Sequence, residues 1–148
     1  VKGWAADAAS EILVAAGVQH CQVNAAGDLA LRGGWFDSVA GVVKPWSIGV
    51  VNPDNRGEIV KVYEITDGAI ATSGTYERGA HIHDPLNGLI AIGAKSATVV
   101  GPEGWLCDAM ATAVMVGGQD SAKWFGQPEL QGYQVFAVNR HEQSAWEI

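Results

Sequence analysis

The stretch from Ile70 to Gly88, which reads IATSGTYERGAHIHDPLNG, places the strongest constraint on how this chain can fold. It concentrates hydroxyl, imidazole and carboxylate side chains between apolar, strand-like runs, so we expect a long connection on a β scaffold. Gly74 and Gly79 permit a close approach of the backbone to a ligand. Long polar connections inside a compact domain usually carry function. The stretch therefore predicts a functional loop, and an ordinary solvated turn remains the alternative for its HIHDP part.

A second feature is the apolar segment from Trp105 to Val116, which reads WLCDAMATAVMV and predicts a helix. Asp108 and Thr112 interrupt it at a spacing of one turn, which puts both side chains on one helical face. Each has a structural explanation when it is taken singly. A carboxylate near a helix start favours the helix dipole, and a threonine hydroxyl often bonds back to the carbonyl one turn earlier. As a pair of oxygen ligands on a buried face, they suit a hard cation such as Mg²⁺.

Six motifs follow one another along the chain in a fixed order. The motifs are VKGWAAD at 1–7, NAAGD at 24–28, WSIGVVNP at 46–53, ATSGTY at 71–76, HIHDP at 81–85 and DAMATA at 108–113. The set resembles the ApbE family of FAD:protein FMN transferases, also called the thiamine biosynthesis lipoprotein family, and the resemblance spans nearly the whole chain. Ala26 replaces the second glycine of the family's N-A-G-G-D pattern.

The resemblance implies a Mg²⁺-dependent reaction that moves FMN from FAD to a Thr or Ser hydroxyl of a target flavoprotein. His81 matches the family's histidine and is expected to act as the catalytic base, whereas His83 falls at a position that the family leaves variable. Metal ligands are expected from the side chains of Asp108 and Thr112 and from the backbone carbonyl at Val1.

The remaining site residues are expected to bind the flavin cofactor or its phosphates. Hydroxyl and backbone N–H groups suit direct contacts with phosphate, and charged side chains suit direct or supporting contacts. For the charged residues, a purely structural role is the equal alternative. The expected cofactor-binding residues are Thr72, Ser73 and Gly74, with Lys2, Asp7 and Asp28 in supporting positions.

The resemblance also implies the partners. An acceptor flavoprotein would carry a D-x-x-[ST]-G-A-[ST] motif, and no segment of this chain fits that pattern, so the chain is not its own substrate. A homodimer and a location in the bacterial periplasm or at the cell envelope are further expectations. Two alternatives stay open: a FAD pyrophosphatase that releases FMN and AMP, and a flavin-binding fragment without catalysis.

Bulk properties set the limits of these expectations. The 148 residues make one domain's worth of chain, and residues 1–148 are expected to form a single ApbE-like domain. The net charge is −7 with no cluster of Lys and Arg, which argues against a nucleic-acid partner.

Because the chain begins inside a motif, we expect the C-terminal portion of a longer protein or a naturally shortened relative. The two cysteines, Cys21 and Cys107, are expected to be buried thiols.

The order of apolar periodicities predicts an α+β fold, an antiparallel sheet with two main helices, and the resemblance adds the ApbE-like tunnelling type. Asp7 is expected in the first turn of the first helix, Asp67-Gly68 in a hairpin turn, and residues 33–45 in an irregular excursion. The expected helices cover residues 4–16 and 105–116, and the expected strands cover 18–25, 29–32, 46–51, 59–65, 97–100, 133–138 and 144–148.

Overall fold

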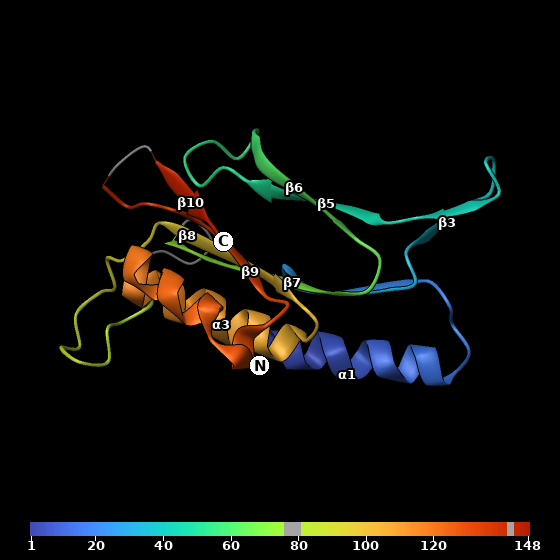
Figure 1. Ribbon diagram of the computed structural model, residues 1–148, viewed down its shortest axis with the longest axis horizontal. Coiled ribbons are helices and arrows are strands. Elements are labelled where there is room, and N and C mark those ends of the chain that lie inside the picture. The colour runs from blue at the N-terminus through green and yellow to red at the C-terminus, as the bar shows by residue number, and fades with distance from the viewer. Residues whose placement is uncertain (76–80, 142–143) are drawn as a thin grey trace.

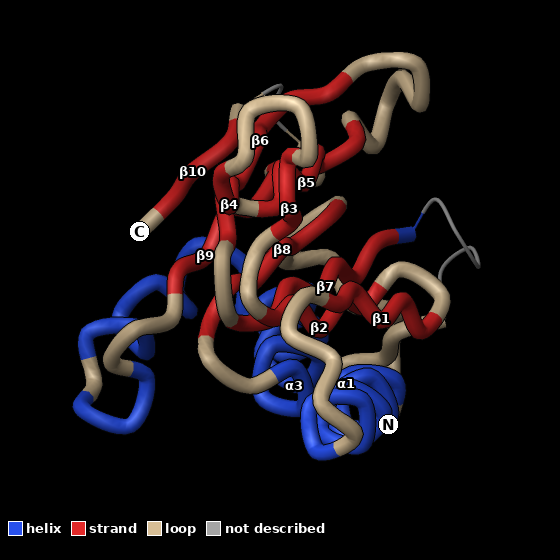
Figure 2. The backbone as a smooth tube through the Cα atoms, turned by 90° about the vertical axis from the view of Figure 1, so that its right-hand side faces the viewer, coloured by secondary structure: helices blue, strands red, loops and turns tan. Residues whose placement is uncertain are grey.

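The computed structural model describes residues 1–75, 81–141 and 144–148 and has three layers. Two helices, α1 (Lys2–Ala15) and α3 (Gly104–Gly117), cover one face of a six-stranded antiparallel sheet, and a two-stranded hairpin covers the other face (Figures 1 and 2). The sheet has the order β1-β2-β7-β8-β9-β10. Its strands are β1 (Cys21–Ala25), β2 (Asp28–Arg32), β7 (Gly68–Gly74), β8 (Ser96–Gly101), β9 (Gln134–Val138) and β10 (Ala145–Glu147).

Two smaller sheets and a 3₁₀ region complete the fold. The hairpin over the open face pairs β5 (Trp46–Val51) with β6 (Ile59–Ile65). A second ribbon, β3 (Trp35–Asp37) with β4 (Val42–Lys44), extends away from the layers (Figure 1). The 3₁₀ segments are η1 (Gly118–Gly126) and η2 (Pro128–Leu130). The predicted α+β class with two helices is confirmed.

Alternation along the strands divides the core into two clusters. On β7, Ala69 and Ala71 face the helices, whereas Ile70 between them faces the hairpin. Small side chains on the helix side let α3 pack close to the sheet, with Val99 and Met115 filling the layer. Both cysteines are buried free thiols, as predicted.

Three local predictions were wrong. Residues 70–74 are not part of a loop but the end of β7, which lies between β2 and β8. Asp67-Gly68 does not turn a hairpin, because β6 pairs with β5 in a separate sheet and the Asp67 carboxylate instead accepts the N–H of Gly33 at 2.8 Å. Residues 33–45 contain the β3–β4 ribbon. Tyr76 and Gly79, to which the sequence motifs drew attention, lie outside the described residues.

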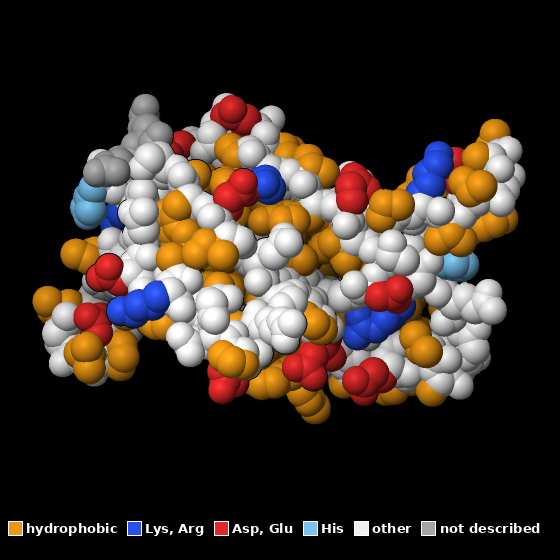
Figure 3. Space-filling view, in the orientation of Figure 1, with side chains coloured by type: hydrophobic (Ala, Val, Ile, Leu, Met, Phe, Trp, Pro, Cys, Tyr) orange, Lys and Arg blue, Asp and Glu red, His pale blue; other side chains and the backbone are white. Residues whose placement is uncertain are grey.

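Charged groups on the face shown in Figure 3 are spread out, and Lys and Arg side chains lie apart from one another, often beside Asp or Glu. Two ion pairs tie the hairpin region to the rest of the molecule: Lys61 in β6 pairs with Glu147 in β10, and Lys95 pairs with Asp54 in the β5–β6 connection. Among the described residues, no helix is both long enough and apolar enough to span a bilayer.

Candidate functional site

A pocket of about 830 Å³ opens where β7 ends, between helix α3 and the β5–β6 hairpin. A cavity of this size falls in the range of small-molecule and cofactor sites. Its walls come from the start of α1, the β1–β2 turn, β5, β7, the segment after residue 80 and α3. The lining residues are Lys2, Ala26, Gly27, Gly49, Val50, Val51, Thr72, Ser73, Gly74, His81, Ile82, His83, Asp108 and Thr112.

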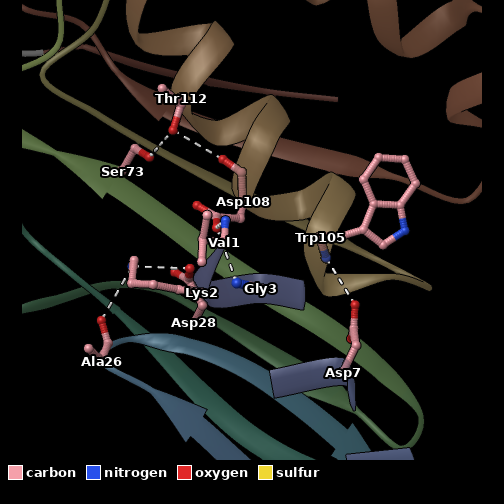
Figure 4. Close-up of polar contacts among 10 residues, drawn as sticks. All are labelled: Val1, Lys2, Gly3, Asp7, Ala26, Asp28, Ser73, Trp105, Asp108 and Thr112. Atoms are coloured by element: carbon pink, nitrogen blue, oxygen red, sulfur yellow. Dashed lines mark hydrogen bonds and ion pairs between the residues drawn. The ribbon is translucent and has the colours of Figure 1, made fainter. Parts of the chain in front are cut away.

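Asp108 faces this pocket from α3 and is fixed by the start of α1 (Figure 4). The backbone N–H of Gly3 donates to Oδ2 of Asp108 at 3.1 Å. Burial acts to raise the pKa of Asp108, but this hydrogen bond and nearby positive charge outweigh it and hold the pKa below its usual value. Gly3 approaches Oδ2, and no other residue of the described ranges is seen to donate to Oδ1. The carboxylate is therefore ionised, oriented and able to bind a cation.

Thr112 lies one helical turn after Asp108, as the spacing predicted, and joins a short chain of hydroxyl contacts. Its Oγ1 donates to the carbonyl oxygen of Asp108 at 3.1 Å, which is the back-bonding expected for a helical threonine. The same oxygen lies 3.0 Å from Oγ of Ser73 on β7 (Figure 4). The prediction of a buried face was wrong: Asp108 is partly buried and Thr112 is exposed, because this side of α3 forms a pocket wall.

The predicted carbonyl ligand, Val1, is also close to Asp108. Its carbonyl oxygen accepts the N–H of Ala5 at 3.0 Å, as the first helical bond of α1. A carbonyl oxygen has two lone pairs, so this bond leaves one of them available. Of the three predicted metal-ligating residues, Asp108 and Thr112 line the pocket, whereas Val1 lies beside Asp108 and does not line it.

The donor set fits a hard cation in part. Carboxylate, hydroxyl and carbonyl oxygens are the ligands that Mg²⁺ takes in proteins, usually with phosphate and water oxygens. Across residues 1–75, 81–141 and 144–148, no group of three or more His, Cys, Asp or Glu side chains is placed to hold a metal. The pocket therefore suits a cation whose shell is completed by a ligand.

Lys2 and Asp28 form a charged pair at the floor of the pocket. Nζ of Lys2 lies 3.0 Å from Oδ2 of Asp28 and 3.4 Å from the carbonyl oxygen of Ala26 (Figure 4). Asp28 is almost fully buried, and burial raises its pKa while the Lys2 ammonium opposes that rise. Only Lys2 of this pair lines the pocket. Asp28 thus lies behind the lysine and holds it.

Asp7 takes a different position from the one predicted. Helix α1 begins at Lys2, so Asp7 lies beyond its first turn, and the pocket does not include it. Its carboxylate instead accepts the backbone N–H groups of Gly104 and Trp105, each at 3.0 Å, and Arg32 lies 3.8 Å from Oδ1. The first N–H groups of a helix lack intrahelical partners, and a carboxylate there satisfies them and complements the dipole. Asp7 therefore caps α3, the helix that carries Asp108.

The two helices meet at glycines that the sequence patterns did not single out as contacts. A Cβ on Gly3 would lie 2.0 Å from the carbonyl oxygen of Gly104, and a Cβ on Gly104 would lie 2.9 Å from Oδ1 of Asp7. Neither position has room for a side chain. The VKGWAAD motif thus supplies the close approach through Gly3 and the cap through Asp7.

His81 and His83 both line the pocket, and both are exposed. Alternation in an extended segment predicted one shared face for them, and their common pocket agrees with it. The turn after them is fixed locally, since Asp84 accepts the backbone N–H of Leu86 and the side-chain amide of Asn87. The assignment of His81 over His83 continues to rest on its position in the motif.

Thr72 lies on the opposite face of β7 from Ser73. Its Oγ1 lies 2.8 Å from Oγ1 of Thr98, its direct partner across β7 and β8. The pocket is also lined by residues for which the motifs predicted no site role: 26–27, the β5 residues 49–51, and Ile82. Residues 26–27 and 49–51 lie inside two of the six motifs, NAAGD and WSIGVVNP. Their place in these motifs was the sequence signal that could have predicted them as pocket residues.

A six-stranded antiparallel sheet with two helices on one face, and a pocket at the end of a central strand, defines an α+β protein with a candidate small-molecule site. Comparison with known proteins gives the family. The chain matches the ApbE family over residues 1–137. It therefore belongs to the ApbE family.

Related proteins agree in sequence and in structure. FAD:protein FMN transferase of Vibrio cholerae is 32% identical over 129 residues, which cover 80% of this chain and 37% of that protein. The Escherichia coli K12 protein of the same name is 29% identical over 153 residues, covering 97% and 42%. The crystal structure of the ApbE protein of Thermotoga maritima superimposes with a TM-score of 0.82 at 30% identity, over 98% of this chain and 48% of that chain. The chain thus spans less than half the length of these relatives.

Proposed function

We propose that this chain carries the catalytic pocket of a Mg²⁺-dependent FAD:protein FMN transferase, which moves FMN from FAD to a Thr or Ser hydroxyl of a target flavoprotein. The observation that carries the proposal is the convergence of Asp108, Thr112, Lys2 and two histidines on one pocket. Family membership and the names of the relatives support it.

The charges in the pocket match a pyrophosphate ligand. FAD offers two linked phosphates, and their oxygens are suited both to a lysine ammonium and to a magnesium ion. Lys2 would bind one phosphate, while Asp108, Thr112 and the carbonyl of Val1 would hold Mg²⁺ against the phosphates. When bound there, Mg²⁺ would offset the negative charge that develops on the phosphoryl oxygens and on the departing AMP.

The chain's own residues have separate tasks in this reaction. The acceptor hydroxyl attacks the phosphorus on the FMN side, a new P–O bond forms, and the pyrophosphate P–O bond breaks with AMP leaving. His81 takes the proton of the acceptor hydroxyl, because a threonine hydroxyl barely ionises near neutral pH. Thr72, Ser73 and Gly74 line the pocket at the end of β7, and the flavin phosphates would lie beside them. Asp7 and Asp28 act indirectly, through α3 and through Lys2.

Two neighbouring functions use the same pocket. A FAD pyrophosphatase would employ water in place of the protein hydroxyl, and a flavin-binding fragment would hold FAD without cleaving it. Transfer is the favoured function because the relatives are named FAD:protein FMN transferase. The proposal includes an acceptor with a D-x-x-[ST]-G-A-[ST] motif and, from the resemblance, a location in the bacterial periplasm or at the cell envelope.

Product analysis separates the three functions. The chain is incubated with FAD, Mg²⁺ and an acceptor peptide, and the products are read by mass spectrometry and chromatography. The proposal predicts one equivalent of AMP for each FMN attached to the peptide. Free FMN and AMP without peptide modification indicate hydrolysis, and intact FAD indicates binding alone or no interaction; either result contradicts transfer by this chain.

A further inference from the structure

The hydroxyl of Ser73 makes a contact that the proposed reaction does not require. Its Oγ lies 3.0 Å from Oγ1 of Thr112, although the two residues belong to different elements and lie 39 positions apart. Ser73 lies at the end of β7 on the face toward α3, so the contact crosses from sheet to helix (Figure 4).

The direction of the proton in this contact follows from hydrogen-bond accounting. A threonine hydroxyl has one proton and two acceptor lone pairs. A carbonyl oxygen only accepts, so the proton of Thr112 is committed to the carbonyl oxygen of Asp108 at 3.1 Å. Thr112 therefore accepts the proton of Ser73 with one lone pair. One lone pair remains, and Thr112 lines the pocket.

We infer that Ser73 is a positioning residue for a divalent cation: its hydroxyl occupies one of the two lone pairs of Thr112, so that the other is left for a cation in the pocket beside Asp108. This inference rests on the proposed cation site and deepens it. Without the bond from Ser73, both lone pairs of Thr112 would be free to accept water. Thr112 would then no longer present a single open lone pair to the cation.

A separate contact orients the other oxygen ligand, Asp108. The backbone N–H of Gly3 occupies Oδ2 of Asp108 from the side of α1, which leaves Oδ1 for the cation. Two ligands on one helix are thus oriented from two sides, Asp108 by α1 and Thr112 by β7. Groups that orient metal ligands commonly change metal affinity by about 10- to 100-fold when they are removed.

Manganese is a suitable probe, because it binds oxygen ligands and broadens nearby NMR signals. The chain contains five threonines, so methyl labelling of threonine gives a spectrum in which each signal can be assigned. With FAD present to complete the metal shell, Mn²⁺ should broaden the Thr112 methyl of the wild-type chain at the lowest concentration. Thr66 serves as the internal reference, because it lies in the β6–β7 connection, at the end of β7 away from the pocket.

Three substitutions at Ser73 test the hydroxyl itself. Ser73→Ala should raise the Mn²⁺ concentration for half-broadening of Thr112 by about tenfold. Ser73→Thr keeps the hydroxyl and should stay within about twofold of wild type, while Ser73→Cys, a weaker donor of similar size, should lie between them. Ser47→Ala is the matched control, because Ser47 is exposed on β5 and does not line the pocket. Amide spectra verify that each variant is folded.

The outcomes are distinct from those of the transfer assay. An unchanged midpoint in Ser73→Ala, or an equal loss in Ser73→Thr, overturns the positioning role. Broadening that does not begin at Thr112 in the wild-type chain overturns the placement of the cation. Transfer of FMN to a peptide is read by mass in a separate experiment, so its failure leaves the Mn²⁺ result to be judged on its own.

Discussion

The backbone N–H of Gly3 and the Oδ2 atom of Asp108 lie 3.1 Å apart, although 105 positions separate the two residues in the chain. This bond joins the first turn of α1 to the side of α3 that faces the pocket. It requires the two helices to approach closely, and the glycines at positions 3 and 104 make that approach possible. The geometry of the candidate metal site therefore depends on the packing of the two helices.

Gly3→Ala tests this packing. The added Cβ would lie 2.0 Å from a backbone carbonyl oxygen, so α1 and α3 must move apart. We expect a loss of about 1–3 kcal/mol in the free energy of unfolding, measured by urea denaturation. Gly126→Ala is the control, because a Cβ there meets no atom within 4 Å, and it should change stability by less than about 0.5 kcal/mol. Equal effects of the two substitutions would contradict the role of Gly3.

Asp7→Ala removes the cap of α3. Two helix N–H groups lose their acceptor, and we expect a loss of about 1–2 kcal/mol in the free energy of unfolding. Asp120→Ala, which removes an exposed carboxylate at η1, is the comparison and should cost less than about 0.5 kcal/mol. Chemical denaturation of both variants decides the matter. If Asp7→Ala leaves the free energy of unfolding unchanged, the cap contributes little to stability.

Asp28 should leave a signature in the pH dependence of stability. Burial raises its pKa above the ordinary 3.8, so the folded chain keeps the proton over a range in which the unfolded chain has released it. The stabilising contribution of Asp28 to the free energy of unfolding is thus fully present below pH 3.8. It is lost as the pH rises through the pKa that Asp28 has in the folded chain. Compared with Asp28→Asn, wild type should lose stability as the pH increases above that value. Parallel stability curves for the two proteins, from urea titrations at each pH, would refute the assignment.

The two histidines should differ in a transfer-competent system. His81→Ala should lower the rate of FMN transfer by roughly a hundredfold to ten-thousandfold, the usual contribution of a general base. The acidic limb of the pH–rate profile should disappear with the imidazole, while FAD affinity stays nearly intact. His83→Ala is the matched control and should stay within about threefold of wild type. Similar rates for the two variants, or an inactive His83→Ala alone, would place the base elsewhere.

Sequence patterns predicted the parts of the fold that depend on local periodicity. The helix over residues 105–116 and the strand over residues 59–65 both follow from the spacing of their apolar side chains, and both are present. The β3–β4 ribbon was missed, because glycines and small polar residues hide its alternation. The end of β7 was read as a loop because hydroxyls and Gly74 occupy it, although pairing with β8 keeps it extended.

The sequence predicted candidate residues for the site but not the hydrogen bonds that join them to distant parts of the chain. The motifs pointed to Asp108, Thr112 and Val1; the first two line one pocket, and Val1 lies beside Asp108. The role of Asp7 depends on backbone groups at Gly104 and Trp105, almost a hundred positions away. The contact of Ser73 with Thr112 likewise depends on the packing of α3 against β7. Neither relationship leaves a periodic signal in the sequence.

The affinity of the chain for Mg²⁺ alone should be weak. Two side-chain oxygens and one carbonyl are a poor shell for an ion that prefers six oxygens and gives up water reluctantly. Calorimetry of the chain without flavin should show little or no heat at millimolar Mg²⁺. Tight binding that survives Asp108→Ala would place the metal outside this pocket.

The central claim is that this pocket holds the FAD pyrophosphate together with Mg²⁺, and a fluorescence titration of FAD tests it most directly. FAD alone should bind weakly, with a dissociation constant well above micromolar. Mg²⁺ should tighten the binding by about tenfold or more in the wild-type chain and have no effect in Asp108→Ala. The claim is contradicted if Mg²⁺ does not change the affinity of the wild-type chain, or if it tightens FAD binding equally in Asp108→Ala.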